Sequence, residues 1–165
     1  MLLRTLTVTV AATAAFGGLA GTALAHQRLA PAPDLYLQAS NEIVKAGDTT
    51  KVTLTVGNSG TGATTADAAL QIVTPFYVAV GEKAPKGCTA TPAKPVPGVP
   101  QTVKCTVPKG LKPKKDVKIE LPLAVDKKAP RGPLAGAALV MMSGQDKDAF
   151  PGDNAAAFTL MTLPA

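Results

Sequence analysis

The two cysteines, Cys88 and Cys105, are the residues whose type and number indicate chemistry most clearly. Two cysteines cannot form a four-cysteine zinc site, and their spacing is far from the Cys-x-x-Cys pattern of a redox or metal-binding pair. An even number of cysteines in a chain that carries an export signal, described below, indicates a disulfide. We therefore predict a structural Cys88–Cys105 bridge, worth about 3 kcal/mol by loop-closure entropy.

The single histidine, His26, limits both catalysis and metal binding. Ser-His-Asp chemistry would have to use His26, and no serine after residue 25 lies in a Gly-x-Ser-x-Gly setting. An N-terminal His26 could chelate copper through its amine and imidazole, but a copper site of this kind needs a second histidine, which the chain lacks. The sequence also lacks a phosphate loop and a dinucleotide fingerprint. We therefore expect no enzyme, no cofactor and no metal site.

Three aspartates, Asp146, Asp148 and Asp153, fall in one predicted loop and could hold calcium. The loop lacks EF-hand spacing, and Lys147 opposes the charge of the carboxylates. A polar loop between strands is the favoured interpretation, and calcium binding is the alternative.

Eight lysines lie between Lys83 and Lys115, and no acidic residue interrupts them. Five prolines between Pro85 and Pro100 argue against regular structure, so we expect one long loop followed by the strand that bears Cys105. A solvated loop is the favoured interpretation. The alternative is attraction to an anionic polymer of the cell envelope or to a membrane surface. The candidates for such a contact are Lys109, Lys112, Lys114 and Lys115.

Residues 1–25 have the pattern of a secretory signal peptide. Arg4 gives a positively charged start, an uncharged stretch follows, and Ala23-Leu24-Ala25 is a small-x-small cleavage site. The alternative is an uncleaved anchor. Cleavage would leave about 140 residues, enough for one domain, and no second apolar run of about 20 residues that could span a membrane. We expect a secreted monomer with a flexible lead-in at 26–33 and a domain at 34–165.

Alternation of apolar and polar residues predicts an all-β domain. The clearest example runs from Val117 to Val125, where Pro122 on the outer face predicts an edge or a bulge. Further strands are expected near 52–56, 66–72, 76–80, 102–107, 134–142 and 155–162. Seven or eight short strands with turn residues between them and no convincing helix indicate an immunoglobulin-like antiparallel β-sandwich.

Several short motifs together resemble the bacterial conserved-repeat domains of unknown function, which are immunoglobulin-like and related to cell adhesion. The stretch TLTVGNSG (53–60) is similar to their strand–Asn-x-Gly–strand signature, and Asp153-Asn154-Ala155 to the start of their last strand. Cys88 and Cys105 look like the paired cysteines of the family, whereas Lys114 replaces its usual glycine. The resemblance implies an extracellular or surface location and no known catalytic residues.

Two functions follow from these observations. The first is a secreted, non-enzymatic interaction module, extracellular or associated with the cell envelope, whose partner is a protein or an anionic envelope polymer. The alternative is a secreted inhibitor or small-ligand-binding protein that uses the basic stretch from Lys83 to Lys115. Nucleic acid is not an expected partner, because no aromatic side chains are interleaved with the lysines.

Overall fold

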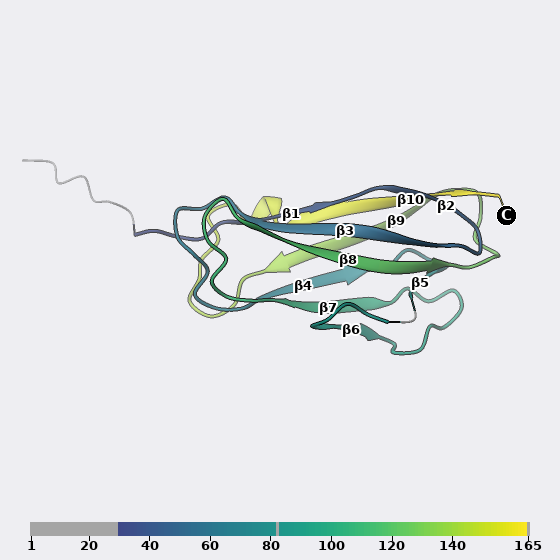
Figure 1. The fold of residues 1–165 in the computed structure, drawn as a ribbon, viewed down its shortest axis with the longest axis horizontal. Coiled ribbons are helices and arrows are strands. Elements are labelled where there is room, and N and C mark those ends of the chain that lie inside the picture. Colours follow the sequence, from purple (N-terminus) through teal and green to yellow (C-terminus); the bar gives the residue numbers. More distant parts are fainter. Residues whose placement is uncertain (1–29, 82, 165) are drawn as a thin grey trace, which may run out of the picture.

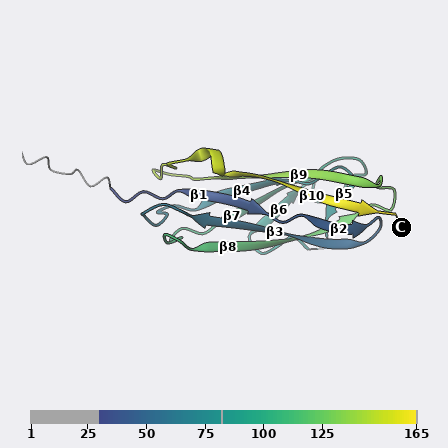
Figure 2. The ribbon, with the colours of Figure 1, turned by 90° about the horizontal axis from the view of Figure 1, so that it is seen from above.

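The computed structural model describes residues 30–81 and 83–164, and the predicted signal peptide (1–25) lies outside the described residues. The described chain forms two packed β-sheets, which Figures 1 and 2 show from two directions. The first sheet contains, in order, β1 (Leu35–Ala39), β3 (Thr49–Asn58), β8 (Asp116–Val125) and β5 (Val78–Val80). The second contains, in order, β2 (Glu42–Lys45), β10 (Ala155–Leu163), β9 (Gly132–Met141), β4 (Ala68–Val73), β7 (Thr102–Val107) and β6 (Cys88–Thr91). A short 3-10 helix, η1 (Pro151–Asp153), precedes β10.

The core lies between the two sheets and consists of the apolar members of the alternating strands. Leu54 of β3 and Leu121 of β8 face inward from the first sheet, and Leu70 and Phe158 face inward from the second; all four are 0% exposed. Because side chains alternate between the two faces of a strand, one buried face per sheet is enough to build a sandwich. The predicted all-β, immunoglobulin-like sandwich is confirmed, with one parallel pair, β2–β10, among antiparallel pairs.

The described residues form ten strands rather than the seven or eight expected. Strand β6 is the clearest difference, because it lies in the stretch that was predicted to lack regular structure. The prolines nearest to it, Pro85 and Pro92, lie just outside its ends and remove no hydrogen bond from it. Cys88 lies directly opposite Cys105 in the β6–β7 pair, and the predicted disulfide joins them. The short edge strand is thus tied covalently to its neighbour.

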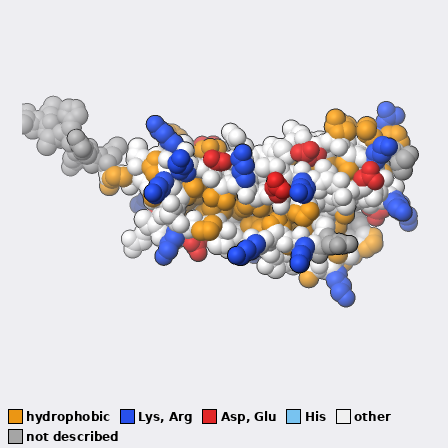
Figure 3. Space-filling model, viewed as in Figure 1, with side chains coloured by type: hydrophobic (Ala, Val, Ile, Leu, Met, Phe, Trp, Pro, Cys, Tyr) orange, Lys and Arg blue, Asp and Glu red, His pale blue; other side chains and the backbone are white. Residues whose placement is uncertain are grey.

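Strand β8 has β3 beside it along nearly its whole length, whereas β5 covers only residues 123–125 on its other side. Pro122 lies where this second pairing ends, and its carbonyl oxygen accepts the N–H of Gly81 at 2.9 Å. Proline has no N–H to leave unpaired, so it suits the start of an open edge, as predicted. Along that edge Val117 and Ile119 are only partly buried, and Figure 3 shows a band of hydrophobic side chains on this face.

Strands account for nearly all the regular structure, and the described residues contain no apolar helix of membrane-spanning length.

Candidate functional site

The first candidate site is a groove on the open side of the sandwich, between the edge strands β5 and β6. Ala79 and Val80 line it from β5, and Cys88 and Ala90 line it from β6; its volume is about 520 Å³. A second hollow of about 220 Å³ adjoins it and shares Ala79 and Pro95 with it. We call the two hollows together the groove, and β5, β6 and the 92–101 loop the groove side of the molecule.

The second hollow presents the larger apolar side chains of the groove. Tyr77, Val96 and Val99 line it and are 43%, 48% and 48% exposed. The N–H of Val99 donates to the carbonyl of Val96 at 3.0 Å, and Gly98 has φ +74°. Proline at position 97 followed by a glycine with positive φ is typical of a type II turn. This turn holds both valines at the rim of the groove.

One buried side chain, Gln101, fastens the 92–101 loop to the first sheet. It is 1% exposed; its Oε1 accepts the N–H of Val80 at 2.6 Å, and its Nε2 donates to the carbonyl of Pro92 at 2.7 Å. A glutamine inside an apolar stretch carries no distinguishing pattern, so sequence reasoning did not identify it. Two interactions therefore hold the walls of the groove in place: the hydrogen bonds of Gln101 and the disulfide.

The eight lysines of the acid-free stretch do not form one basic loop, so that prediction is wrong. Because β6 and β7 pair with each other, they divide the stretch into separate regions. Lys83 and Lys94 are exposed and adjoin Ala84 and Ala93, which line the groove. The four candidates for anionic contact lie instead in the loop between β7 and β8, and all are exposed: Lys109, Lys112, Lys114 and Lys115. Their contact with an anionic surface stays a prediction.

The loop that carries these four lysines belongs to the opposite end of the sandwich, where β1 begins and β3 ends. We call this the aspartate end; it comprises Asp34 and the loops at 59–67, 108–115 and 142–154. Asn58 connects three of its segments and is 0% exposed. Its Oδ1 accepts the N–H groups of Asp34 and Gly60, and its Nδ2 donates to the carbonyls of Gly62 and Leu111. The asparagine of the Asn-x-Gly signature therefore holds these segments together through hydrogen bonds.

Lys114 adopts φ +60° in this end, and its N–H donates to the carbonyl of Asn58 at 2.7 Å. A left-handed backbone favours glycine, because glycine has no Cβ to clash with the chain. Glycine would adopt this conformation more easily than Lys114 does.

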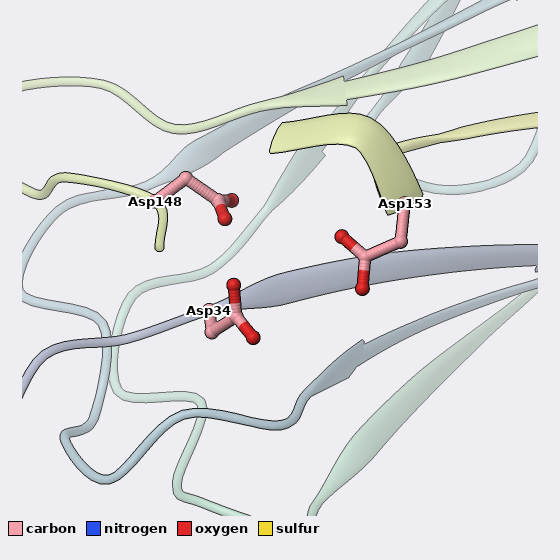
Figure 4. A group of neighbouring side chains, drawn as sticks. All are labelled: Asp34, Asp148 and Asp153. Carbon is pink, nitrogen blue, oxygen red and sulfur yellow. The ribbon is translucent and has the colours of Figure 1, made fainter. Parts of the chain in front are cut away.

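Three carboxylates from distant parts of the sequence meet at the aspartate end (Figure 4). One oxygen each of Asp34, Asp148 and Asp153 lies within 4.8 Å of the others. Asp34 precedes β1 and is buried, Asp148 is partly buried in the loop before β10, and Asp153 is exposed in η1. The N–H of Phe150 lies 2.9 Å from Asp34 Oδ1 and 3.1 Å from Asp148 Oδ1, so the two carboxylates share one donor.

The pKa values of the two inner carboxyls move in opposite directions. Burial raises the pKa of Asp148 above its ordinary 3.8, although the hydrogen bond from Asn154 opposes the rise. Burial also acts to raise the pKa of Asp34, but hydrogen bonds from Ser59, Asp148 and Phe150 outweigh it and lower that pKa. Asp148 is therefore the carboxyl of the pair that takes up a proton more readily.

The trio that meets is not the one that the sequence suggested, because Asp146 lies elsewhere. Its Oδ1 accepts the hydroxyl of Thr65 at 2.6 Å, and its Oδ2 accepts the N–H groups of Thr65 and Ala66. These bonds tie the 142–154 loop to the segment before β4. Asp34 takes the third place in the trio, and nothing in its local sequence could have indicated this.

Comparisons with known proteins support the fold. No protein-family model matches the chain, and no curated protein sequence matches it. Among solved structures, the CARDB domain of a Pyrococcus furiosus protein, solved in complex with di-metal ions, is similar at a TM-score of 0.52 and 13% identity, over 82% of this chain and 96% of that one.

Two further structures have the same architecture. The third cohesin of ScaC from Acetivibrio cellulolyticus, solved with the ScaB dockerin, gives a TM-score of 0.51 at 16% identity, over 78% of this chain and 99% of the other. CaCohA2 from Clostridium acetobutylicum gives 0.52 at 15% identity, over 78% and 90%. At these identities the likeness shows an immunoglobulin-like sandwich; it does not extend to the particular repeat family that the motifs resemble.

Proposed function

We propose that this chain is a secreted, non-enzymatic interaction module, extracellular or associated with the cell envelope, whose groove binds a segment of another protein. The observation that carries the proposal is the exposure of Tyr77, Val96 and Val99 around a preformed apolar groove. Exposed apolar groups that gather at one site typically mark an interaction surface, and a rigid turn that presents them lowers the entropy cost of binding.

The charge around the groove favours a partner segment that is apolar with acidic neighbours. Residues 83–99 contain Lys83, Lys86 and Lys94 and no acidic residue. Such a rim speeds encounter with acidic segments and makes it dependent on salt. The two solved cohesin relatives named above share only the fold with this chain, but one was solved with a protein partner, its dockerin, which is consistent with a binding role for such a sandwich.

The chemistry of the groove supports binding over catalysis. Asp126 is the one carboxylate among the described residues that line it, and the remaining polar side chains are hydroxyls, an amide and the disulfide. Nucleophilic catalysis needs a nucleophile beside an activating base, and the described residues that line the groove offer no histidine, lysine or free thiol to pair with Asp126.

The test uses two exposed valines, whose replacement leaves the core intact. Tagged Val96→Ser/Val99→Ser protein, unchanged protein and an Ile43→Ser control are each incubated with native envelope and culture supernatant. Ile43 is 72% exposed on β2, at the opposite edge of the second sheet, so it is an exposed apolar residue that does not line the groove. We expect a partner retained by the unchanged and Ile43→Ser proteins, bound at least about tenfold more weakly by the double variant.

Equal retention by all three proteins would contradict a role for the groove. Fractionation then separates the two functions. A protein retained on the envelope and released by salt supports the interaction module. A freely diffusing protein that carries a bound small molecule supports the alternative, and the 520 Å³ hollow lies within the usual range for small ligands.

A further inference from the structure

The trio of carboxylates at the aspartate end lacks a cation that would balance its charge. Among the described residues the one ion pair within 4.0 Å is Lys51–Glu120, which is exposed and lies on β3 and β8. Asp34, Asp148 and Asp153 therefore face one another without a lysine or arginine partner. Like charges held this close repel unless a proton or a cation lies between them.

Asn154 provides an independent sign that a group is missing from this place. The residue is 5% exposed, and its Nδ2 donates to Asp148 Oδ2 at 2.8 Å, so its amide lies against the trio. Its Oδ1 is the one buried side-chain oxygen or nitrogen in the described chain that has no hydrogen-bond partner. A buried oxygen without a donor is costly, and native structures rarely leave one unsatisfied.

We propose that Asp34, Asp148 and Asp153, together with the side-chain oxygen of Asn154, bind one Ca²⁺ ion. Four oxygens from two segments of chain suit calcium, which accepts six to eight oxygen ligands in flexible geometry and fills the remaining places with water. Magnesium demands a tighter octahedron and gives up its water reluctantly, so it fits a site assembled from separate segments less well.

The carboxylate separations agree with a shared ion. Oxygens that each lie 2.3–2.6 Å from one calcium cannot be more than about 5 Å apart, and the three carboxylate oxygens lie within 4.8 Å of one another. A half-turn of the Asn154 amide about its last bond would bring Oδ1 beside Asp148, an arrangement that a shared cation stabilises.

The consequence of binding is mechanical. Asp34 immediately precedes β1, and residues 148–154 belong to the connection from β9 to β10, so the ion would join the start of one strand of the first sheet to the start of the last strand of the second. Binding would therefore stiffen the end of the sandwich at which the described chain enters, and would leave the groove at the other end unchanged.

The test measures calcium binding directly and does not depend on any partner of the groove. Protein freed of metal with a chelator is titrated with CaCl₂ in a calorimeter, and its melting temperature is recorded with about 10 mM CaCl₂ or MgCl₂. We expect a Kd of about 10⁻⁴–10⁻³ M, as in other extracellular calcium modules, and a rise in melting temperature of about 4–8 °C with calcium. The rise with magnesium should be clearly smaller.

Two aspartate variants, one inside the trio and one outside it, make the result specific. Asp153→Asn removes a carboxylate that forms no side-chain hydrogen bond in the described chain, so the fold should persist while calcium affinity falls at least about tenfold. Asp116→Asn is the matched control, because Asp116 is exposed at the start of β8 and lies outside the trio, so its calcium response should equal that of the unchanged protein. The absence of calcium heat and thermal shift, an equal response of Asp153→Asn, or an equal shift with magnesium would each overturn the proposal.

Discussion

The aspartate end and the groove side are held together by different means. At the aspartate end, the side chains of Asp34, Asn58 and Asp146 bind backbone groups of segments up to 116 residues away in sequence. On the groove side, one disulfide and Gln101 hold a short strand and a proline-rich loop. At the aspartate end, many hydrogen bonds fix the positions of the loops relative to one another. On the groove side, only the disulfide and Gln101 hold the strand and the loop, and apolar side chains between them stay exposed. This difference matches the two proposals, which assign ion binding to the aspartate end and partner binding to the groove side.

Removing Asn58 should have the largest effect, because it is the common partner of three segments at the aspartate end. Asn58→Ala leaves two N–H groups and two carbonyls without their partners in a fully buried place. We expect a loss of about 3–4 kcal/mol in the free energy of unfolding, measured by urea denaturation. A loss below about 1 kcal/mol would show that this end does not depend on its hydrogen-bond hub.

Removing the disulfide should have a slightly smaller effect, concentrated on the groove side. Replacing Cys88 and Cys105 together by alanine opens a loop with a sequence separation of 17 residues. We expect a loss of about 3 kcal/mol by loop-closure entropy, seen as a lower melting temperature. Hydrogen exchange should rise in β6 and the 92–101 loop more than at the aspartate end. An unchanged melting temperature after reduction of the unchanged protein would contradict a stabilising bridge.

The contribution of Asp146 to the stability of the fold should be smaller and should depend on pH. The hydrogen bond from the Thr65 hydroxyl lowers the pKa of Asp146 below its ordinary 3.8, with burial opposing and two backbone N–H groups adding to the shift. A lowered pKa means that this carboxylate stabilises the fold above pH 3.8 and loses its effect as the pH falls through the lowered value.

Asp146→Asn should therefore cost about 1 kcal/mol at neutral pH, because it weakens charge-assisted hydrogen bonds. The difference from the unchanged protein should shrink as the pH falls below 3.8. Urea denaturation at a series of pH values measures it, and Glu120→Gln on the exposed face of β8 serves as the control. A difference in the free energy of unfolding that stays constant down to low pH would show that the charge of Asp146 does not contribute to stability.

The strands and the disulfide could be predicted from the sequence because their signals are local or unique. Alternation reports which face of a strand is buried, as in Val117–Val125, and two cysteines allow only one intramolecular pairing. Strand β6 was not predicted, because its four residues show only weak alternation and the prolines near it argued against regular structure. In the structure, pairing with β7 provides hydrogen-bond partners for its backbone. The single basic loop was wrong for the same reason, since strand pairing separates lysines that are close in sequence.

The sequence by itself determined the class of fold, the covalent bridge and the turns, since each depends on side-chain period, residue number or the backbone preferences of glycine and proline. Only the tertiary structure decided which groups meet. Asp34 joins Asp148 across 114 positions, Asp146 goes to Thr65, and Gln101 reaches β5. The physical reason is that these contacts depend on how two sheets stack and on where their connecting loops end. No local pattern of residues encodes that arrangement.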